Sequence, residues 1–147
     1  MAIITGGAGN DAMGNNQGVI VTGGAGDDLM VGNAGIVVDG GEGNDAMFGN
    51  VGFFVEGGAG DDLMVGNLGI VEVNGGDGND ALGFNVGNAV RGGEGDDLLV
   101  GNVGYSVEGN AGNDALIGNF GTIIDGGAGA DFLDSNVGID LPPTFPF

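Results

Sequence analysis

Eight aspartates recur along the chain at an almost constant spacing, and each one follows a glycine-rich segment. Neighbouring members are seventeen residues apart, except for one step of eighteen. They are Asp11, Asp28, Asp45, Asp62, Asp80, Asp97, Asp114 and Asp131. Calcium takes about six to eight oxygen ligands, which carboxylates and backbone carbonyls supply. The spacing therefore predicts one metal site repeated along the chain rather than a single reaction centre.

The glycines before each aspartate explain how a short turn could supply the other ligands. Each aspartate is the sixth residue of a segment that begins GGxG, or GNAG in the seventh copy. Glycine has no Cβ, so a tight turn can direct several carbonyls towards one point. The predicted ligands are the eight aspartates, with backbone carbonyls near Gly6, Gly23, Gly40, Gly57, Gly75, Gly92, Gly109 and Gly126.

The composition excludes several other kinds of chemistry. The chain of 147 residues carries 21 acids and a single basic residue, Arg91, for a net charge of −20, and it has neither His nor Cys. A Ser/His/Asp or Cys/His centre is therefore excluded, and zinc, haem and iron–sulfur sites lack their usual ligands. The charge also opposes binding to nucleic acid. No apolar run reaches the ~18 residues of a membrane span. We expect no enzyme, no nucleic-acid partner and no membrane insertion.

The other repeated residues indicate the fold that positions the aspartates. Within each copy, the eighth residue is Met or Leu, the eleventh is Asn, the thirteenth is Gly and the sixteenth is apolar. Short apolar segments thus alternate with turns, and no segment has a helical period. The sequence predicts an all-β parallel β-roll, a solenoid of about eight 17-residue coils with two short strands per coil and a thin core. The asparagines would stack as a hydrogen-bonded ladder or remain solvated turn residues.

The segments "GGAGNDAMG", "GGAGDDLMV" and "GGEGNDAMF" fit the nonapeptide GGxGxDxUx. Over roughly 130 residues the chain resembles the RTX β-roll family, whose repeats of this kind bind calcium. The resemblance implies that each ion lies between two stacked turns, with about seven ions within the chain and one more between chains where two copies meet end to end. In the family two nonapeptides usually form one coil. Here the second half of each coil is GNxG without an aspartate, so we expect calcium along one edge only.

The chain divides into a predicted calcium-binding β-roll domain, residues 1–141, and a Pro-rich C-terminal tail, residues 142–147. The tail would cap the last coil, contact a neighbouring copy or act as a secretion signal. The N-terminus has no basic region or long apolar segment typical of a cleaved signal peptide. The resemblance to RTX proteins implies secretion to the outside of the cell by the type I route, without a cleaved signal peptide.

A second period of about two coils appears at the fifth and seventh residues of each copy. The fifth residue alternates between Asn and Asp, and the seventh between Ala and Leu, up to the last copy. Duplication of a two-coil unit would produce this pattern. Alternatively, the seventh residues point outwards and form a row of small and large side chains that packs against another copy.

Three classes of function remain open from the sequence. The first is an extracellular, calcium-stabilised structural protein that self-assembles into head-to-tail filaments, with possible lateral contacts. The second is a monomeric calcium-binding module that acts in adhesion or binds ice, as some calcium-dependent rolls resembling this chain do. Ice binding is disfavoured because no row of Thr runs along the calcium edge. The third is a carrier or secretion module of an RTX enzyme or toxin.

Overall fold

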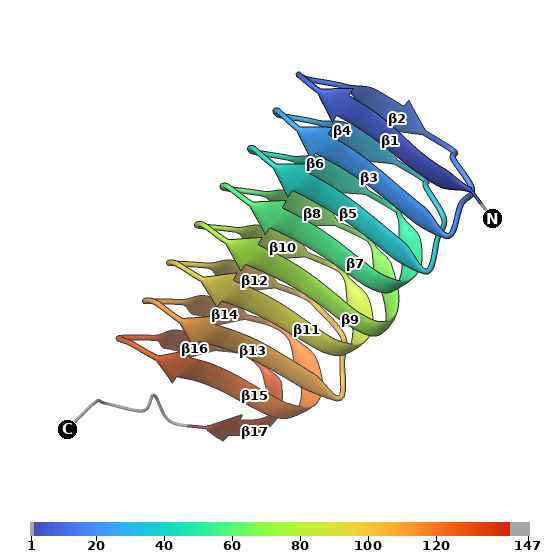
Figure 1. Cartoon of the computed structure of the whole chain (residues 1–147). Coiled ribbons are helices and arrows are strands. Elements are labelled where there is room, and N and C mark those ends of the chain that lie inside the picture. The colour runs from blue at the N-terminus through green and yellow to red at the C-terminus, as the bar shows by residue number, and fades with distance from the viewer. Residues whose placement is uncertain (1, 142–147) are drawn as a thin grey trace.

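The computed structural model describes residues 2–141, which form one parallel β-solenoid (Figure 1). One sheet has nine strands in the order β1-β3-β5-β7-β9-β11-β13-β15-β17, and the other has eight, from β16 to β2. The all-β solenoid and its eight coils are therefore confirmed. The first and last described coils lie at opposite ends of the stack (Figure 1). None of the described segments is a helix long and apolar enough to cross a membrane.

The strands of the two sheets alternate along the chain. The nine-stranded sheet comprises β1 (Ile3–Ala8), β3 (Ile20–Ala25), β5 (Val37–Glu42), β7 (Val51–Ala59), β9 (Leu68–Asp77), β11 (Val86–Glu94), β13 (Ser106–Ala111), β15 (Phe120–Ala128) and β17 (Val137–Leu141). The eight-stranded sheet comprises β2 (Ala12–Gly14), β4 (Leu29–Val31), β6 (Ala46–Phe48), β8 (Leu63–Val65), β10 (Ala81–Gly83), β12 (Leu98–Val100), β14 (Ala115–Ile117) and β16 (Phe132–Asp134).

The odd-numbered strands are longer than the three or four residues that the apolar segments predict. Strand β3, for example, runs to Ala25 and so includes the first three residues of the segment "GGAG". Gly24, with φ of 116°, still pairs with Gly7 and Gly41 in the adjacent coils. The turn is consequently confined to the fourth to sixth residues of each copy. The aspartate is thus the last residue of the turn and immediately precedes the next short strand.

The coils stack in register, so equivalent residues form straight columns. Val21 pairs with Val38, seventeen residues later, and this spacing holds for most of the solenoid. In the eighteen-residue step, Gly52 pairs with Gly69 but Phe54 pairs with Glu72. The extra residue therefore forms a bulge just after Gly69. The register is restored before the next turn, and the aspartate column continues undisturbed.

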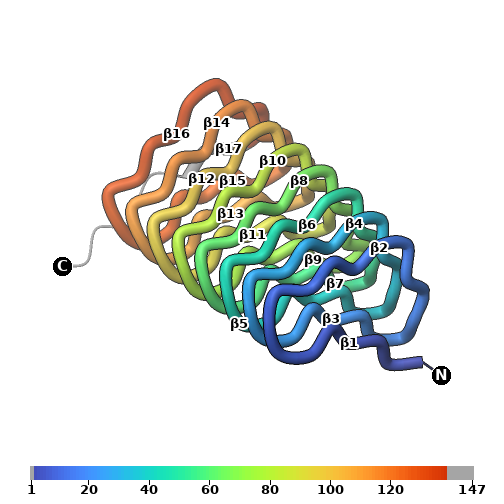
Figure 2. Tube along the Cα trace, turned by 90° about the horizontal axis from the view of Figure 1, so that it is seen from above, coloured from blue at the N-terminus to red at the C-terminus, as the bar shows by residue number. Residues whose placement is uncertain are grey.

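The core is one residue deep on each side. Each coil contributes the Met or Leu in the middle of its short strand and a Val or Ile of its long strand, and the coils stack one behind the other (Figure 2). Met30, Val38, Met47 and Val55 are fully buried. A core this thin buries little apolar area per coil, so the solenoid needs stabilising contacts at its corners.

The second corner of each coil holds the predicted asparagine ladder. Oδ1 of Asn33 accepts hydrogen bonds from the backbone N–H and from Nδ2 of Asn16, both at 3.0 Å. Nδ2 of Asn33 donates to the carbonyl of Met13 at 3.0 Å. The same pattern recurs along the column, whose inner members are 0–1% exposed: Asn33, Asn50, Asn67, Asn85, Asn102 and Asn119. The ladder interpretation is confirmed, and the solvated alternative is wrong for these six residues.

Candidate metal centre

The eight predicted aspartates form a single column inside the first corner of the coils. The six inner members, Asp28, Asp45, Asp62, Asp80, Asp97 and Asp114, are only 1–2% exposed. Asp11 and Asp131, at the two ends of the column, are half-buried. The neighbouring Asp27 is exposed whereas Asp28 is buried. Adjacent carboxylates thus point to opposite sides of the turn and do not form an acid–base pair.

One oxygen of every column carboxylate after Asp11 links its coil to the preceding one. Oδ1 of Asp62 accepts a hydrogen bond from the backbone N–H of Asp45 at 2.7 Å. Oδ1 of Asp28 accepts from Asp11 in the same way, also at 2.7 Å. The contact recurs through the column at 2.7–3.0 Å. It fixes the orientation of the side chain and so determines where the second oxygen points.

The second oxygen, Oδ2, is buried and lacks a hydrogen-bond partner among the described residues in Asp28, Asp45, Asp62, Asp80, Asp97, Asp114 and Asp131. A Cβ placed on Gly57 would lie 2.3 Å from Oδ2 of Asp62 and 2.4 Å from the carbonyl oxygen of Gly75, the equivalent glycine of the next coil. Two oxygens from adjacent coils therefore converge beside the first glycine. Any side chain larger than hydrogen would fill this space.

The β-ladder passes over this first glycine in every coil. Thr22 pairs with Asp39 and Gly24 pairs with Gly41, but the intervening Gly23 and Gly40 form no pair of the ladder. The same gap occurs between the other coils of the nine-stranded sheet up to β15. The backbone thus leaves its regular pairing at the residue whose carbonyl points into the corner. In all eight copies this glycine lies beside Oδ2 of the column aspartate, and its role as a calcium ligand stays a prediction.

The second and fourth glycines of each turn serve a different purpose. Gly58 and Gly60 have φ of 118° and 124°, a conformation that side-chain-bearing residues rarely adopt. A Cβ on Gly58 would also lie 2.1 Å from the carbonyl oxygen of Gly41. In the seventh copy Asn110 takes the place of the second glycine, with φ of 79°. These glycines allow the coils to stack closely at the turn.

The column is electrostatically unfavourable without a cation. Burial raises the pKa of Asp62 and Asp97 to about 7, and that of Asp45, Asp80 and Asp114 to about 6. The hydrogen bond from the preceding backbone N–H lowers each pKa, but this effect is smaller than that of burial. For Asp62, the charges of Asp80 and Asp45 raise the pKa further. The folded chain therefore favours either protons or a positive ion in this corner.

The donor set fits calcium. The available groups are carboxylate oxygens that lack hydrogen-bond partners and backbone carbonyl oxygens, which are the hard ligands that calcium prefers. Within residues 2–141, no three Asp, Glu, His or Cys side chains gather as a ligand group. An ion in this column would accordingly take most of its ligands from the backbone. Each could lie between two coils, since the two oxygens beside Gly57 come from different coils.

The sequence did not reveal a second ladder on the outside of the same corner. The backbone N–H of Asp27 donates to Oδ1 of Asn10 at 3.0 Å, and that of Asn44 donates to Oδ1 of Asp27 at 2.9 Å. In this ladder each backbone N–H donates to a side chain of the preceding coil. In the buried aspartate ladder each backbone N–H donates to a side chain of the following coil. The sequence feature that could have predicted this ladder is the fifth residue of each copy, which is always Asn or Asp up to Asn113. Both side chains carry an accepting Oδ1.

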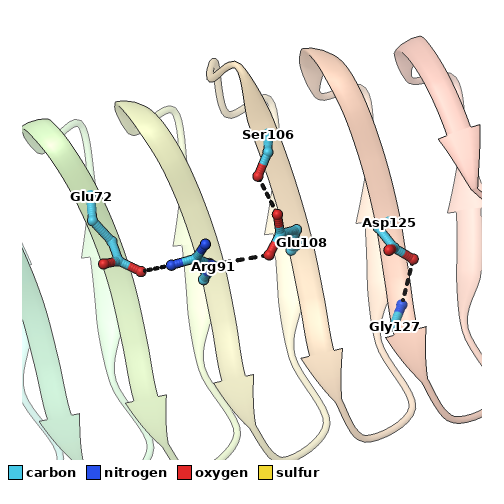
Figure 3. Close-up of polar contacts among 6 residues, drawn as sticks. All are labelled: Glu72, Arg91, Ser106, Glu108, Asp125 and Gly127. Carbon is cyan, nitrogen blue, oxygen red and sulfur yellow. Dashed lines mark hydrogen bonds and ion pairs between the residues drawn. The ribbon is translucent and has the colours of Figure 1, made fainter.

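The single basic residue lies on the outer face of the nine-stranded sheet. Arg91 in β11 forms ion pairs with Glu72 in β9 and Glu108 in β13, the latter at 3.0 Å (Figure 3). Ser106 also hydrogen-bonds to Glu108. In β15, Oδ1 of Asp125 accepts from the backbone N–H of Gly127 (Figure 3). Arg91 thus offsets part of the acidic charge on this face, away from the aspartate column.

Comparison with known families identifies the repeats. The chain matches a family described as RTX calcium-binding nonapeptide repeat (4 copies) over residues 12–36, 37–53, 56–90, 88–105, 106–122 and 123–142. The chain belongs to this RTX calcium-binding repeat family. Comparisons with curated proteins and with solved structures give no match. This RTX chain is thus a calcium-binding structural β-roll, and proteins with such repeats are typically secreted.

Proposed function

We propose that this protein is an extracellular, non-enzymatic structural protein that calcium folds into a rigid roll and that then joins end to end into filaments. The observation that carries the calcium part is the row of seven buried Oδ2 atoms that have no hydrogen-bond partner within residues 2–141. Each would bind an ion together with backbone carbonyls of its own turn and of the next one, except in the last turn, where no turn follows Asp131. Asp11 supplies the equivalent Oδ2 in the first turn. The ligands are the eight column aspartates and the carbonyls near the first glycine of each copy.

Calcium would couple folding to the environment outside the cell. In its absence the aspartates of the column repel one another, and ordering a glycine-rich chain costs about 1–2 kcal/mol per residue in backbone entropy. About seven divalent ions would offset most of the −20 charge and would also hold adjacent coils together. Extracellular calcium modules typically bind at about 0.1–1 mM, so a secreted chain would fold after export.

End-to-end growth is supported by the way the coils contact one another. The two corner ladders repeat with the same geometry from coil to coil, so a contact between chains could reuse the contact between coils. Strands β1 and β17 are the outermost strands of the nine-stranded sheet. Pairing β1 of one copy with β17 of another joins unlike surfaces, and such contacts propagate rather than close.

Strand β17 also refines the expected ion count. It adds a ninth strand to one sheet only, so the C-terminal end of the stack is stepped. When β1 of one copy pairs with β17 of its neighbour, β17 separates the Gly6 turn of the first copy from the Gly126 turn of the second. This contact supports about seven ions within each chain and does not support an additional ion between chains. The tail, residues 142–147, lies outside the described residues.

The extra strand β17, which extends only one of the two sheets, also favours a second candidate function. If β17 caps the last coil, the protein acts as a monomeric calcium-binding module of an adhesion system. Electron microscopy and light scattering in millimolar calcium distinguish the two. We expect filaments that disappear when Ile3→Pro and Ile4→Pro block β1, while far-UV circular dichroism remains β-rich. A protein that stays short at all concentrations in calcium would contradict the filament proposal and leave the calcium-binding roll.

A further inference from the structure

One face of the solenoid carries a single charged residue, Asp134 in the last coil. In the first seven coils no charged residue occurs between the column aspartate and the strand after the asparagine corner. This region includes the outer side of the eight-stranded sheet, formed by the first and third residues of each even-numbered strand, which we call the apolar face. Leu29, Leu63, Leu98 and Phe132 on it are 41–58% exposed. Such a continuous apolar surface marks an interaction site.

Small and large side chains alternate from strand to strand along the apolar face. Its first residue is Ala in β2, β6, β10 and β14, Leu in β4, β8 and β12, and Phe in β16. Two hollows result from this alternation. One, of about 120 Å³, lies over Ala81 and Gly83 in β10 between the leucines of β8 and β12. The other, of about 170 Å³, lies over Ala12 and Gly14 in β2.

The alternation at the first residue of each strand is complementary to itself in one orientation. A twofold axis in the plane of the face and perpendicular to the solenoid axis reverses the order of the strands but retains their direction. Strand β8 then faces β10 of the other copy, and β16 faces β2. Leu63 would enter the hollow over Ala81, and Phe132 would enter the hollow over Ala12. A twofold axis along the solenoid instead places each strand opposite its own copy in the reverse direction, so the leucines of β4, β8 and β12 meet the valines of the same strands.

We propose that the apolar face binds a second copy of this chain, with the two solenoids antiparallel. The inference rests on the calcium-dependent roll proposed above but does not depend on end-to-end growth. The occupant has to be uncharged where it meets this face, and the same face of another copy satisfies that condition. Asp134 of β16 is the one charged residue on it, and it lies at the end of the contact, where it stays solvated.

The size of the face agrees with this occupant. An exposed Leu or Val at these fractions offers roughly 80 Å². The five exposed large apolar residues of the face, together with its half-buried ones, therefore supply on the order of 600 Å² per copy, which approaches the ~800 Å² that each partner of a specific interface buries. Two sheets would pack at about 10 Å, the usual separation of face-to-face sheets. The column aspartates flank the face, and calcium would reduce their mutual repulsion.

Sedimentation velocity in millimolar calcium tests the proposal, using the chain with Ile3→Pro and Ile4→Pro so that end-to-end species do not interfere. We expect a dimer. Ala81→Leu places a large side chain opposite Leu63 twice across the twofold axis and should weaken the dimer by about tenfold or more. Leu63→Ala should also weaken it. The double variant Leu63→Ala with Ala81→Leu exchanges the two partners and should restore most of the affinity.

A matched control comes from Leu68, which is 41% exposed like Leu63 and belongs to the same coil, but lies on the asparagine corner. Leu68→Ala should leave the dimer unchanged, and circular dichroism should show the same calcium-induced fold in every variant. A monomer at all concentrations, or a dimer that Ala81→Leu does not weaken, would overturn the proposal. Binding of that monomer to phosphatidylcholine vesicles would instead assign the face to a lipid surface. If the unmodified chain stops at the dimer, only the filament proposal fails.

Discussion

Asp45 and Asp62, in adjacent coils, are joined by a backbone-to-side-chain hydrogen bond of 2.7 Å in which the N–H of Asp45 donates to Oδ1 of Asp62. Oδ2 of the same carboxylate is buried and has no partner among the described residues. One oxygen therefore holds two coils together while the other is available to a cation. Substitutions that keep or remove Oδ1 can separate these two contributions.

Replacing Asp62 tests this division. Asp62→Asn retains an accepting oxygen but loses the negative ligand, so it should raise the calcium concentration at the folding midpoint. Asp62→Ala also leaves the buried N–H of Asp45 unpaired and should cost about 1–3 kcal/mol more. Asp131→Ala, at the half-buried end of the column, should matter less. Calcium titrations followed by circular dichroism measure the midpoints. Equal losses at Asp62 and Asp131 would argue against ions held between coils.

The first glycine of the turn offers a test that leaves every carboxylate in place. In Gly57→Ala the new Cβ would lie 2.3 Å from Oδ2 of Asp62, so the variant should bind one ion fewer by isothermal titration calorimetry. Gly66→Ala is the matched control, because no atom lies within 4 Å of its Cβ. With φ of 67°, it should cost about 1–2 kcal/mol of stability without loss of an ion. Unchanged ion counts in both variants would contradict the proposed position of the metal.

The columns could be predicted from the repeat, because a residue that recurs in every coil must stack on the equivalent residues of the adjacent coils. The burial of Asp62 and the ladder through Asn67 follow from this rule. The extension of β3 through Gly23 and Gly24 does not, since glycine pairs normally indicate a turn and only stacking keeps them in a strand. The ion pair between Arg91 and Glu72 could not be predicted from the sequence either, because it depends on the strand register that follows the bulge after Gly69.

The asparagine corner should stabilise the roll without binding calcium. Oδ1 of Asn67 accepts two hydrogen bonds from Asn50, at 2.8 and 3.1 Å, and its Nδ2 donates to the carbonyl of Met47 at 2.9 Å. Asn67→Ala leaves these buried groups unpaired and should cost about 2–4 kcal/mol. Urea unfolding in saturating calcium measures the loss, and calorimetry should find the same number of ions. Loss of an ion would instead place a metal ligand at this corner.

The dependence of folding on pH should have opposite signs with and without calcium. In the calcium-free roll, burial raises the pKa of Asp62 and Asp97 to about 7, above the ordinary value of 3.8. The folded state then binds more protons than the unfolded chain between about pH 4 and 7, so its stability falls as the pH rises through this range.

Calcium requires the ionised carboxylates, so its binding should strengthen over the same range. Calcium-free protein should therefore show more β-structure by circular dichroism at pH 5.5 than at pH 7.5, whereas the calcium midpoint should be lower at pH 7.5. Asp62→Asn with Asp97→Asn removes two of the titrating groups and should flatten both trends, because the amide remains neutral throughout. A calcium-free chain equally unfolded at both pH values, together with a calcium midpoint that does not move, would show that the buried column does not control folding.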